Sequence, residues 1–543
     1  MTALVASPLL AAPPAPLLLT GATVYTSSAE APKKAAILVR DGKIAFVGEE
    51  AEARRLAPDS QVVGLKGAVV YPGFVDAHGH LLGLGMTKEL LDLRGRSKEA
   101  ILALVKAAVF RTPEGEWIRG RSWDQNLWPG KAFPKAGELD AVASKHPVVL
   151  ARVDGHALWV NRAGMERAGV TAETKDPDGG KIVRDASGKP TGIFVDNAED
   201  LISRVIPAPG TAQLRRLLEA GTKAAAAVGL TGVGDAGGFG RSGIDILRAM
   251  AREGALPIRV YATVGAASKD LAAFLSSGPI VEGRLTVRAV KIYADGALGS
   301  RGAALLADYS DDPGNRGLVR TPGGKMDEVA LACARAGWQL WTHAIGDRGN
   351  RLALDAYEKA LAVEKPKDPR FRIEHAQVLA PDDIPRLARL GVIASMQPTH
   401  ATSDMPWAEA RLGPERIQGA YAWRSLLASG ARLCGGSDFP VESESPLLGL
   451  YAAVTRQDLA GRPPGGWYPE QRLTRPEALK LFTEDAAYAE FAEGRRGKIA
   501  PAFDADLTVL DRDIVSDTLP AAEIPKAKVL MTIVGGEMVY RAR

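Results

Sequence analysis

Short apolar runs bounded by turn residues dominate both ends of this chain. Near the N-terminus they cover residues 17–25, 36–39 and 44–48, and the last two flank Asp41-Gly42. An Asp-Gly pair between two apolar runs is a strong signal for a β-hairpin. The C-terminus repeats this style at residues 505–511 and in a second hairpin around Gly535-Gly536. We therefore predict that residues 17–70 and 496–543 pair into one small β-sandwich domain.

The long middle of the chain alternates apolar strands with helical patterns, which favours a parallel α/β sheet. The first strand candidate is the apolar run that leads into His78 and His80. Seven more follow, at residues 231–235, 258–264, 285–294, 339–343, 372–375, 392–397 and 431–434. Eight parallel strands with intervening helices are the count of a TIM (β/α)₈ barrel. The predicted fold class is therefore α/β, with the barrel over residues 71–495.

The spacing of the strand candidates also predicts an insertion after the first barrel strand. Lys291 lies much further from His80 than three strand–helix units require. We place the insertion at about residues 95–210, from the usual length of one such unit. Aromatic and polar clusters around Trp123 and His156 suit a lid or a substrate wall there, although ordinary packing explains them equally well.

Four of the seven histidines close apolar, strand-like runs. His78 and His80 are two residues apart, so in an extended strand both imidazoles point to the same side. His343 and His375 end two later strand candidates. A single histidine at a strand end is usually a hydrogen-bonded core or surface residue, but several that converge on one point are typical metal ligands.

Two further residues fit the same site. Lys291 lies inside an apolar strand, where burial lowers the pKa of a lysine and leaves a neutral, nucleophilic amine. Asp438 follows the last strand and Gly435-Gly436, which allow the backbone to approach a ligand closely. Taken alone, Lys291 fits a buried ion pair, and Asp438 fits a helix cap or a turn.

Composition excludes some partners. The formal net charge is only +4 and the basic residues are scattered, so we expect no nucleic-acid partner. No segment offers about 18 uninterrupted apolar residues, so we expect no membrane span. Residues 1–16 are interpreted as a flexible tail or the remnant of a signal sequence, which leaves cytoplasmic and periplasmic or secreted locations open. Cys333 and Cys434 match no metal or redox pattern, and we expect both to be buried apolar side chains.

Six segments in this order resemble the amidohydrolase superfamily, most closely the YtcJ-like amidohydrolase 3 group that includes N-substituted formamide deformylases. The segments are residues 72–80, 291–303, 343–347, 372–377, 436–438 and 497–507. In the last segment Ala502 replaces the more usual glycine, at a position that the family places outside the active site.

The resemblance implies a binuclear metal centre inside a (β/α)₈ barrel. His78, His80 and Asp438 would hold one divalent ion, and His343 with His375 the other. Lys291 would carry a carbamate derived from carbon dioxide, whose two oxygens bridge the ions. Imidazole and carboxylate ligands suit zinc, with manganese, iron and cobalt left open. A metal-bridging hydroxide would then cleave an amide-like, non-peptide carbon–nitrogen bond of a small molecule, with Asp438 and Lys291 as the catalytic residues.

Three other functions stay open at this point. A mononuclear cyclic amidine deaminase of the same superfamily would not need Lys291 as a ligand, and a non-catalytic metal-binding protein would need no substrate. Residues 232–237 have the glycine spacing of a dinucleotide fingerprint, but a single match is a weak signal. The chain has no Gly-x-Ser-x-Gly elbow, which disfavours a serine hydrolase of that type.

The substrate itself is not readable from the sequence. Loops above a barrel carry specificity, so we select five candidates for substrate contact. They are Trp123, His156, Tyr293, Asp295 and Arg301. His146 and His400 are expected to be structural or surface residues, although His400 follows the seventh strand and could reach the pocket. A homo-oligomer is left open.

Overall fold

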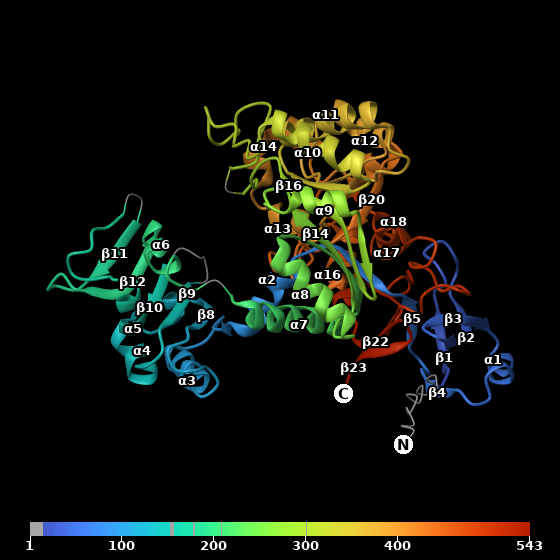
Figure 1. The fold of residues 1–543 in the computed structure, drawn as a ribbon, viewed down its shortest axis with the longest axis horizontal. Coiled ribbons are helices and arrows are strands. Elements are labelled where there is room, and N and C mark those ends of the chain that lie inside the picture. Colours follow the sequence, from blue (N-terminus) through green and yellow to red (C-terminus); the bar gives the residue numbers. More distant parts are fainter. Residues whose placement is uncertain (1–14, 153–156, 178–179, 208, 300) are drawn as a thin grey trace, which may run out of the picture. The chain divides into compact units, whose positions relative to one another are not determined.

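The computed structural model describes residues 15–152, 157–177, 180–207, 209–299 and 301–543. The chain divides into two compact units, shown in Figure 1. One unit combines Met1–Leu84 with Leu218–Arg543, and the other is Gly85–Leu217. Within the described residues, the first unit contains two sheets, and the second contains one.

One sheet of the first unit joins both ends of the chain. Its strands run in the order β23-β22-β21-β5-β1-β2-β3, with β4 beside β1. Both predicted hairpins are confirmed: Asp41 and Gly42 form a two-residue turn with φ of +50° and +73°, and Gly535 and Gly536 form another with φ of +56° and +79°. Positive φ at both positions is what a type I′ turn requires. The strands are β1 (Leu17–Val24), β2 (Lys33–Arg40), β3 (Lys43–Gly48), β4 (Gln61–Gly64), β5 (Val69–Pro72), β21 (Leu507–Leu510), β22 (Val529–Val534) and β23 (Glu537–Arg541).

The core of this sheet unites the two chain ends. β21 pairs antiparallel with β5, and apolar side chains from both ends share one buried cluster that includes Leu19, Ile37, Val70, Leu507 and Ile533. Helix α1 (Glu50–Leu56) covers part of β2 and buries Ala53. The core of this sheet is therefore formed by both ends of the chain together.

The second sheet of the same unit is an eight-stranded parallel barrel. Its strands follow in the order β6-β13-β14-β16-β17-β18-β19-β20, and every neighbouring pair is parallel. The backbone N–H of Asp438, just after β20, donates to the carbonyl of His78 on β6 over 2.7 Å and so joins the last strand to the first. The strands are β6 (Phe74–Gly79), β13 (Leu230–Phe239), β14 (Arg259–Gly265), β16 (Leu285–Tyr293), β17 (Gln339–Ala344), β18 (Arg372–His375), β19 (Ile393–Met396) and β20 (Arg432–Gly435).

Helices follow the barrel strands, as the alternating pattern predicts. Two helices, α2 (Leu81–Glu89) and α7 (Thr211–Ala227), span the boundaries between the units. The others are α8 (Arg241–Arg252), α9 (Leu271–Ser277), α10 (Gly323–Ala336), α11 (Asp347–Glu364), α12 (Ile384–Leu390), α13 (Pro398–Asp404), α14 (Ala408–Arg416), α15 (Trp423–Ala428), α16 (Pro446–Thr455), α17 (Arg475–Leu481) and α18 (Glu484–Ala489). The short strand β15 (Ile280–Glu282) pairs antiparallel with β16.

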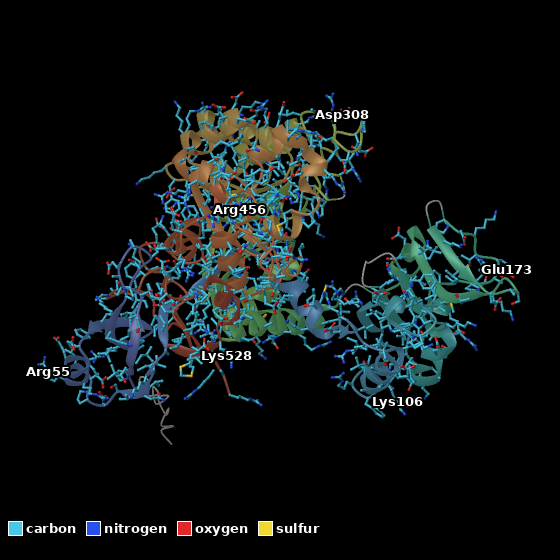
Figure 2. The ribbon with its side chains drawn as sticks, turned by 180° about the vertical axis from the view of Figure 1, so that it is seen from behind. Arg55, Lys106, Glu173, Asp308, Arg456 and Lys528 are labelled. Atoms are coloured by element: carbon cyan, nitrogen blue, oxygen red, sulfur yellow. The ribbon has the colours of Figure 1, made fainter. Side chains whose placement is uncertain are left out.

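The barrel interior is packed with large side chains. Tyr261 stacks on Trp341 with ring centroids 5.6 Å apart, and the Arg372 guanidinium lies 3.6 Å from the centroid of the same Trp341 ring. Arg456, labelled in Figure 2, is another fully buried arginine of this unit. The barrel is therefore a filled core rather than a channel.

The second unit has its own six-stranded sheet in the order β11-β12-β10-β9-β8-β7. Its core gathers Trp123, Trp128, Leu139 and Trp159 with other buried side chains. The strands are β7 (Leu91–Asp92), β8 (Ile118–Trp123), β9 (Val148–Arg152), β10 (Ala157–Val160), β11 (Gly180–Arg184) and β12 (Pro190–Asp196), and the helices are α3 (Lys98–Val109), α4 (Ala136–Ala143), α5 (Arg162–Arg167) and α6 (Asp200–Ser203).

The predicted fold class is confirmed. The structure has a parallel (β/α)₈ barrel, a β domain built from both chain ends, and an inserted unit after the first barrel strand. Among the residues described, no helix is both long and apolar enough to cross a membrane.

Candidate metal centre

The first barrel strand brings two histidines to one side. His78 lies on β6 and is fully buried, whereas His80 follows the strand and is partly exposed. Their ring centroids are 5.5 Å apart. Because residues two apart in a strand share a side, both imidazoles reach the end of the barrel at which the parallel strands finish.

Lys291 reaches the same place from β16. Its side chain is 2% exposed, and its ammonium nitrogen makes no hydrogen bond or ion pair with any residue that the structure describes. Burial lowers the pKa of Lys291 to about 8, although the carboxylates of Glu374 and Asp438 oppose this. About a tenth of the amine is therefore neutral at pH 7, far more than for an exposed lysine.

His343 on β17 and His375 at the end of β18 lie side by side, with ring centroids 4.6 Å apart. His375 has a φ of +76°, in the left-handed region, which costs a non-glycine residue about 1–2 kcal/mol. Burial and the charge of Lys291 lower the pKa of His343 to about 3, and burial and His343 lower that of His375 well below its ordinary value. Both imidazoles therefore stay neutral and keep a lone pair.

The turn after β20 delivers Asp438. A Cβ on Gly436 would lie 2.6 Å from the backbone nitrogen of His78, so only glycine allows β20 to approach β6 this closely. Asp438 itself has a φ of +60°, again in the left-handed region. Its Oδ1 lies 2.9 Å from His80 Nε2 and 3.4 Å from His78 Nε2, and the second distance lacks the geometry of a hydrogen bond.

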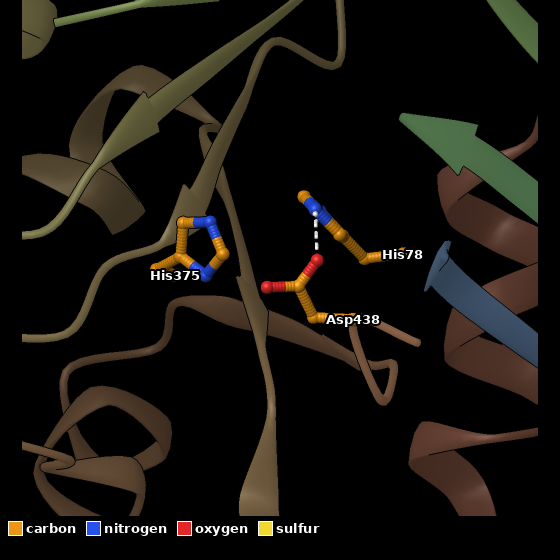
Figure 3. A group of neighbouring side chains, drawn as sticks. All are labelled: His78, His375 and Asp438. Atoms are coloured by element: carbon orange, nitrogen blue, oxygen red, sulfur yellow. Dashed lines mark ion pairs between the residues drawn. The ribbon is translucent and has the colours of Figure 1, made fainter. Parts of the chain in front are cut away.

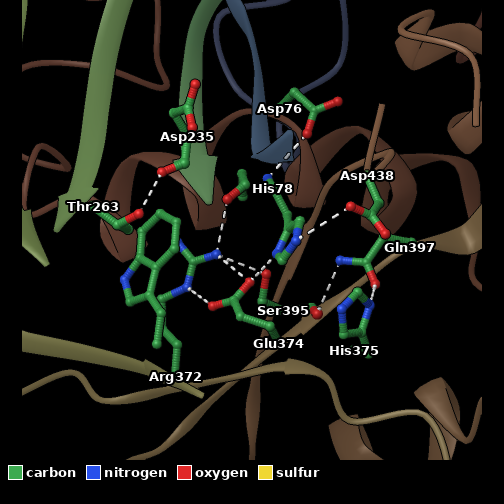
Figure 4. A network of polar contacts seen from close by, with 12 residues as sticks. Asp76, His78, Asp235, Thr263, Arg372, Glu374, His375, Ser395, Gln397 and Asp438 are labelled. Atoms are coloured by element: carbon green, nitrogen blue, oxygen red, sulfur yellow. Dashed lines mark hydrogen bonds and ion pairs between the residues drawn. The ribbon is translucent and has the colours of Figure 1, made fainter. Parts of the chain in front are cut away.

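A buried ion pair on β18 orients His78. Arg372 donates to both oxygens of Glu374 over 2.8 and 2.9 Å, and Glu374 Oε2 contacts His78 Nδ1 (Figure 4). Although burial raises the pKa of Glu374, the charge of Arg372 and the contact with His78 lower it below its usual range. The carboxylate is therefore ionised, and it holds the proton of His78 on Nδ1 and leaves Nε2 free.

Hydrogen bonds fix the tautomers of the other two buried imidazoles as well. Gln397 donates from Nε2 to the Ser395 carbonyl, so its Oε1 accepts from His375 Nδ1 over 2.7 Å. His343 Nε2 donates to the Gly296 carbonyl over 3.4 Å. The free lone pairs are therefore Nε2 on His375 and Nδ1 on His343.

All six predicted ligands line one cavity of about 410 Å³. Within it, one atom each of His78, His375 and Asp438 lie within 4.8 Å of one another (Figure 3). His78 Nε2 is buried and has no hydrogen-bond partner. Imidazole nitrogens without partners beside a carboxylate fit a divalent ion such as zinc, because an unpaired buried polar atom is otherwise costly. The assignment of the six residues as ligands stays a prediction.

The other predicted contacts have different surroundings. Tyr293 lines the cavity, 5.3 Å from His343 between ring centroids. Asp295 is not among the described lining residues: it is fully buried and accepts from the backbone N–H groups of Ala304, Ile345 and Gly346. Arg301 pairs with Asp311 over 2.9 Å and does not line the cavity either.

Two of the predicted contacts belong to the inserted unit. Trp123 is buried in that unit's core and donates from Nε1 to the Leu150 carbonyl over 2.8 Å. His156 lies outside the described residues. His146 of the same unit is buried and bonds through Nε2 to the Thr112 carbonyl over 3.1 Å, as expected for a structural histidine.

Sequence reasoning missed one wall of the cavity. His400, Ser403, Asp404 and Trp407 all line it, from α13 and the residues that follow. Their spacing of three, four and seven residues is that of one helix face, and this pattern after the seventh strand was the available signal. His400 was expected to be structural or on the surface, with the alternative that it reaches the pocket; it does line the cavity and stacks on His375 with ring centroids 5.8 Å apart.

The glycine run at residues 232–237 is not a dinucleotide loop. It lies within barrel strand β13 instead of a turn before a helix. A Cβ on Gly234 would lie 2.4 Å from the carbonyl oxygen of Ala77, so the glycine permits close packing against β6. The dinucleotide interpretation is therefore wrong.

A parallel (β/α)₈ barrel with imidazoles, a buried amine and a carboxylate at the ends of its strands is the architecture of a metal-dependent hydrolase. Residues 61–540 match the amidohydrolase family, and the chain belongs to that family. It is an enzyme of the hydrolase class.

Individual relatives agree with this assignment. The chain is 35% identical over 530 residues to the "Putative amidohydrolase YtcJ" of Bacillus subtilis. This match covers 96% of this chain and 98% of the relative. It is 30% identical over 543 residues to the N-substituted formamide deformylase of Arthrobacter pascens, with coverage of 96% and 98%. A crystal structure of an uncharacterized metal-dependent hydrolase from Pyrococcus furiosus is similar with a TM-score of 0.77 and 29% identity, covering 92% of this chain and 100% of that one.

Proposed function

We propose that this enzyme is a metal-dependent hydrolase of amide-like, non-peptide carbon–nitrogen bonds in small molecules. The observation that carries the proposal is the convergence of six side chains on one cavity from five places on the barrel. They are His78, His80, Lys291, His343, His375 and Asp438. Family membership supports the same reaction class.

His78, His80 and Asp438 would hold one divalent ion, and His343 with His375 a second. The free lone pairs on the buried imidazoles and the short distances from Asp438 to His78 and His80 support this division. Two divalent ions bound there would polarise a substrate carbonyl and lower the pKa of a water molecule. Zinc fits the donor set, and manganese, iron and cobalt also bind such ligands.

Lys291 would become a bridging ligand by reaction with carbon dioxide. The Nζ lone pair would form a bond to the carbon of carbon dioxide as one C=O π bond breaks, one N–H proton would pass to solvent, and a carbamate would remain whose single negative charge is shared by two oxygens. The buried amine, its pKa of about 8 and the absence of a hydrogen bond to any described residue all support this reaction. An unmodified ammonium ion at this position would be costly to bury.

Asp438 would handle the proton during hydrolysis. Its Oδ1 faces His78 and His80, and its Oδ2 lies on the other side, 3.6 Å from His400 Nε2. Oδ2 would accept a proton from the attacking water and pass it to the leaving nitrogen. The cost of the left-handed backbone at Asp438 suggests that the protein holds this orientation against a local preference.

The relative from Arthrobacter pascens indicates which compounds to test first, because its name describes an enzyme that removes formyl groups from N-substituted formamides. The enzyme should be loaded with zinc, manganese or cobalt in bicarbonate buffer and assayed against N-substituted formamides, other amides and ureas. We expect about two metal ions per chain and release of free amine. Metal loading without hydrolysis of any of these compounds would contradict the proposal.

A one-metal deaminase of the same superfamily is the second candidate. The compact group of His78, His375 and Asp438 would fit a single ion, which favours this alternative. It predicts one metal ion per chain, ammonia release from cyclic amidines, and full metal binding in the variant Lys291→Ala. Lys291 is buried and has no ion-pair partner among the described residues, which favours the two-metal centre, because a one-metal site has no use for it.

A further inference from the structure

One face of α13 forms a polar wall of the metal cavity. His400, Ser403 and Asp404 lie on this face, and Trp407, in the turn between α13 and α14, continues the wall. His400 is next to the candidate ligands His375 and Asp438, and Asp404 is one helical turn further along. A substrate whose carbonyl lies at the metal centre would therefore extend past Asp404.

Buried side chains hold the Asp404 carboxylate in place from behind. Tyr421 Oη donates to Asp404 Oδ2 over 2.6 Å, Gln377 Nε2 donates to the same oxygen over 3.1 Å, and Gln377 also donates to Tyr421 over 2.7 Å. Tyr421 is 2% exposed and Gln377 is 4% exposed. Burial and the Asp404 charge raise the pKa of Tyr421 well above its usual range, so the phenol keeps its proton and stays a donor.

This support occupies only one of the two carboxylate oxygens. Asp404 Oδ1 has no hydrogen bond to any residue described in the structure. Arg456 adds a further layer, since it donates to the Tyr421 carbonyl over 3.0 Å and lies against Trp467. A half-buried carboxylate fixed by buried donors, with one oxygen free at the wall of a cavity, is suited to accept a hydrogen bond from a ligand.

The charge of the cavity wall indicates which charge a ligand at this position would carry. Besides Asp404 and the candidate ligand Asp438, Glu442 is a third carboxylate on the lining, and Lys291 is the only lysine or arginine among the described lining residues. Arg411, near Trp407, is already paired with Asp311. The basic residues Arg320 and Lys325 line a second cavity of about 370 Å³, which shares Lys291 and Tyr293 with the metal cavity. The part of the cavity wall near α13 is therefore acidic.

We propose that Asp404, with Glu442 and the ring of Trp407, binds a cationic nitrogen group of the substrate, so that the enzyme prefers amides that carry an ammonium group beyond the scissile bond. The proposal rests on the proposed function, because it places the substrate carbonyl at the metal centre. Asp404 would accept a charge-assisted hydrogen bond, and the indole face of Trp407 would attract the same cation.

Two metal-chelating probes test this without requiring turnover. Aminohexanohydroxamate ends in an ammonium group, and heptanohydroxamate carries a methyl group in its place. Calorimetric titration into the metal-loaded, full-length enzyme should show that the ammonium probe binds at least about tenfold more tightly, as expected for a hydrogen bond to a charged group. In Asp404→Asn the two probes should bind about equally, while the affinity for heptanohydroxamate stays at the wild-type value.

Matched variants separate the local effect from a general one. Glu415→Gln removes one exposed carboxylate on α14, outside the cavity, and should keep the wild-type preference. Glu442→Gln removes the second carboxylate of the wall and should reduce the preference by a smaller factor than Asp404→Asn. It also tests the acidic wall if Asp404→Asn does not fold, as judged by circular dichroism.

The outcomes are distinguishable. Equal binding of both probes to the wild-type enzyme, or a preference that survives in Asp404→Asn, would overturn the cation subsite and leave the proposed hydrolase intact. If neither probe binds the metal-loaded enzyme, the proposed metal centre fails and the subsite falls with it. A preference for the ammonium probe that is lost in Asp404→Asn, reduced in Glu442→Gln and kept in Glu415→Gln would support the proposal.

Discussion

Glu374→Gln is the sharpest test of how the barrel positions its histidines. Glu374 and Arg372 are both fully buried, and Arg372 Nη1 already lacks a hydrogen-bond partner. Gln has the size of Glu but no charge, so the change leaves the guanidinium of Arg372 buried without its counter-ion. Breaking a buried pair in this way costs about 3–5 kcal/mol, which is a large part of the 5–15 kcal/mol that stabilises a typical protein.

The loss should appear in urea denaturation of the metal-free enzyme, followed by tryptophan fluorescence. A matched control is Glu493→Gln, which removes the carboxylate that pairs with Arg370 at a distance of 2.7 Å and is 44% exposed. A pair with an exposed carboxylate contributes about 0–1 kcal/mol, and in this variant Arg370 keeps its second partner, Asp368. If both variants lost the same small amount of unfolding free energy, the buried pair would not have the stabilising role that its geometry indicates.

Two further measurements follow from the same contact. His78 loses the carboxylate that orients it, so the affinity for metal should fall by about 10–100-fold. Arg372 and His78 lower the pKa of Glu374 against the effect of burial, so its contribution to stability is present above the unfolded-state pKa of about 4.3 and is lost as the pH falls below it. The stability difference between wild type and Glu374→Gln should therefore narrow in acid. A difference that grew in acid would contradict this sign.

Three other variants test single roles. Asp438→Asn should keep bound metal and lose about 10²–10⁴-fold in kcat, measured by metal analysis beside steady-state kinetics, and near-normal turnover would refute its role as proton carrier. Lys291→Ala should bind about one metal ion fewer per chain, and carbon-13 bicarbonate should give a carbamate resonance in wild type but not in this variant; unchanged metal content would rule out the bridge. Asp295→Ala leaves three backbone N–H groups without their acceptor, and at about 1–3 kcal/mol for each it should lower the unfolding free energy by at least about 3 kcal/mol in urea denaturation. A loss below about 1 kcal/mol would show that Asp295 does not anchor this loop.

The barrel strands were predictable because parallel strands are buried on both faces and read as continuous apolar runs. The run at residues 372–375 coincides with β18, and the run at 285–294 differs from β16 by one residue. Histidines at the ends of such runs marked the site, since chemistry in this fold lies where the strands end.

The parts that were missed have a common physical reason. A polar helix face that borders a cavity has the same residue types as one that faces water, so the spacing of Asp404 and Trp407 after the seventh strand was only a weak signal. Asp295 was interpreted as a substrate contact, but its carboxylate accepts hydrogen bonds from three backbone N–H groups instead. Trp123 belongs to the core of a unit whose six-stranded sheet the pattern did not predict.

The metal centre and the closure of the barrel depend on the same few residues. Asp76 accepts hydrogen bonds from the backbone of His78 and from both the backbone and the side chain of Ser437, and the Asp438 N–H donates to the His78 carbonyl. Any opening between β6 and β20 must therefore separate His78 from Asp438. A ligand that binds only the closed form stabilises it by about 2.7 kcal/mol at a concentration one hundred times its Kd. Metal bound to His78 and Asp438 should therefore hold the first and last strands together, so that the melting temperature rises with the concentration of free metal ion, and an unchanged melting temperature would show that the two residues do not share an ion.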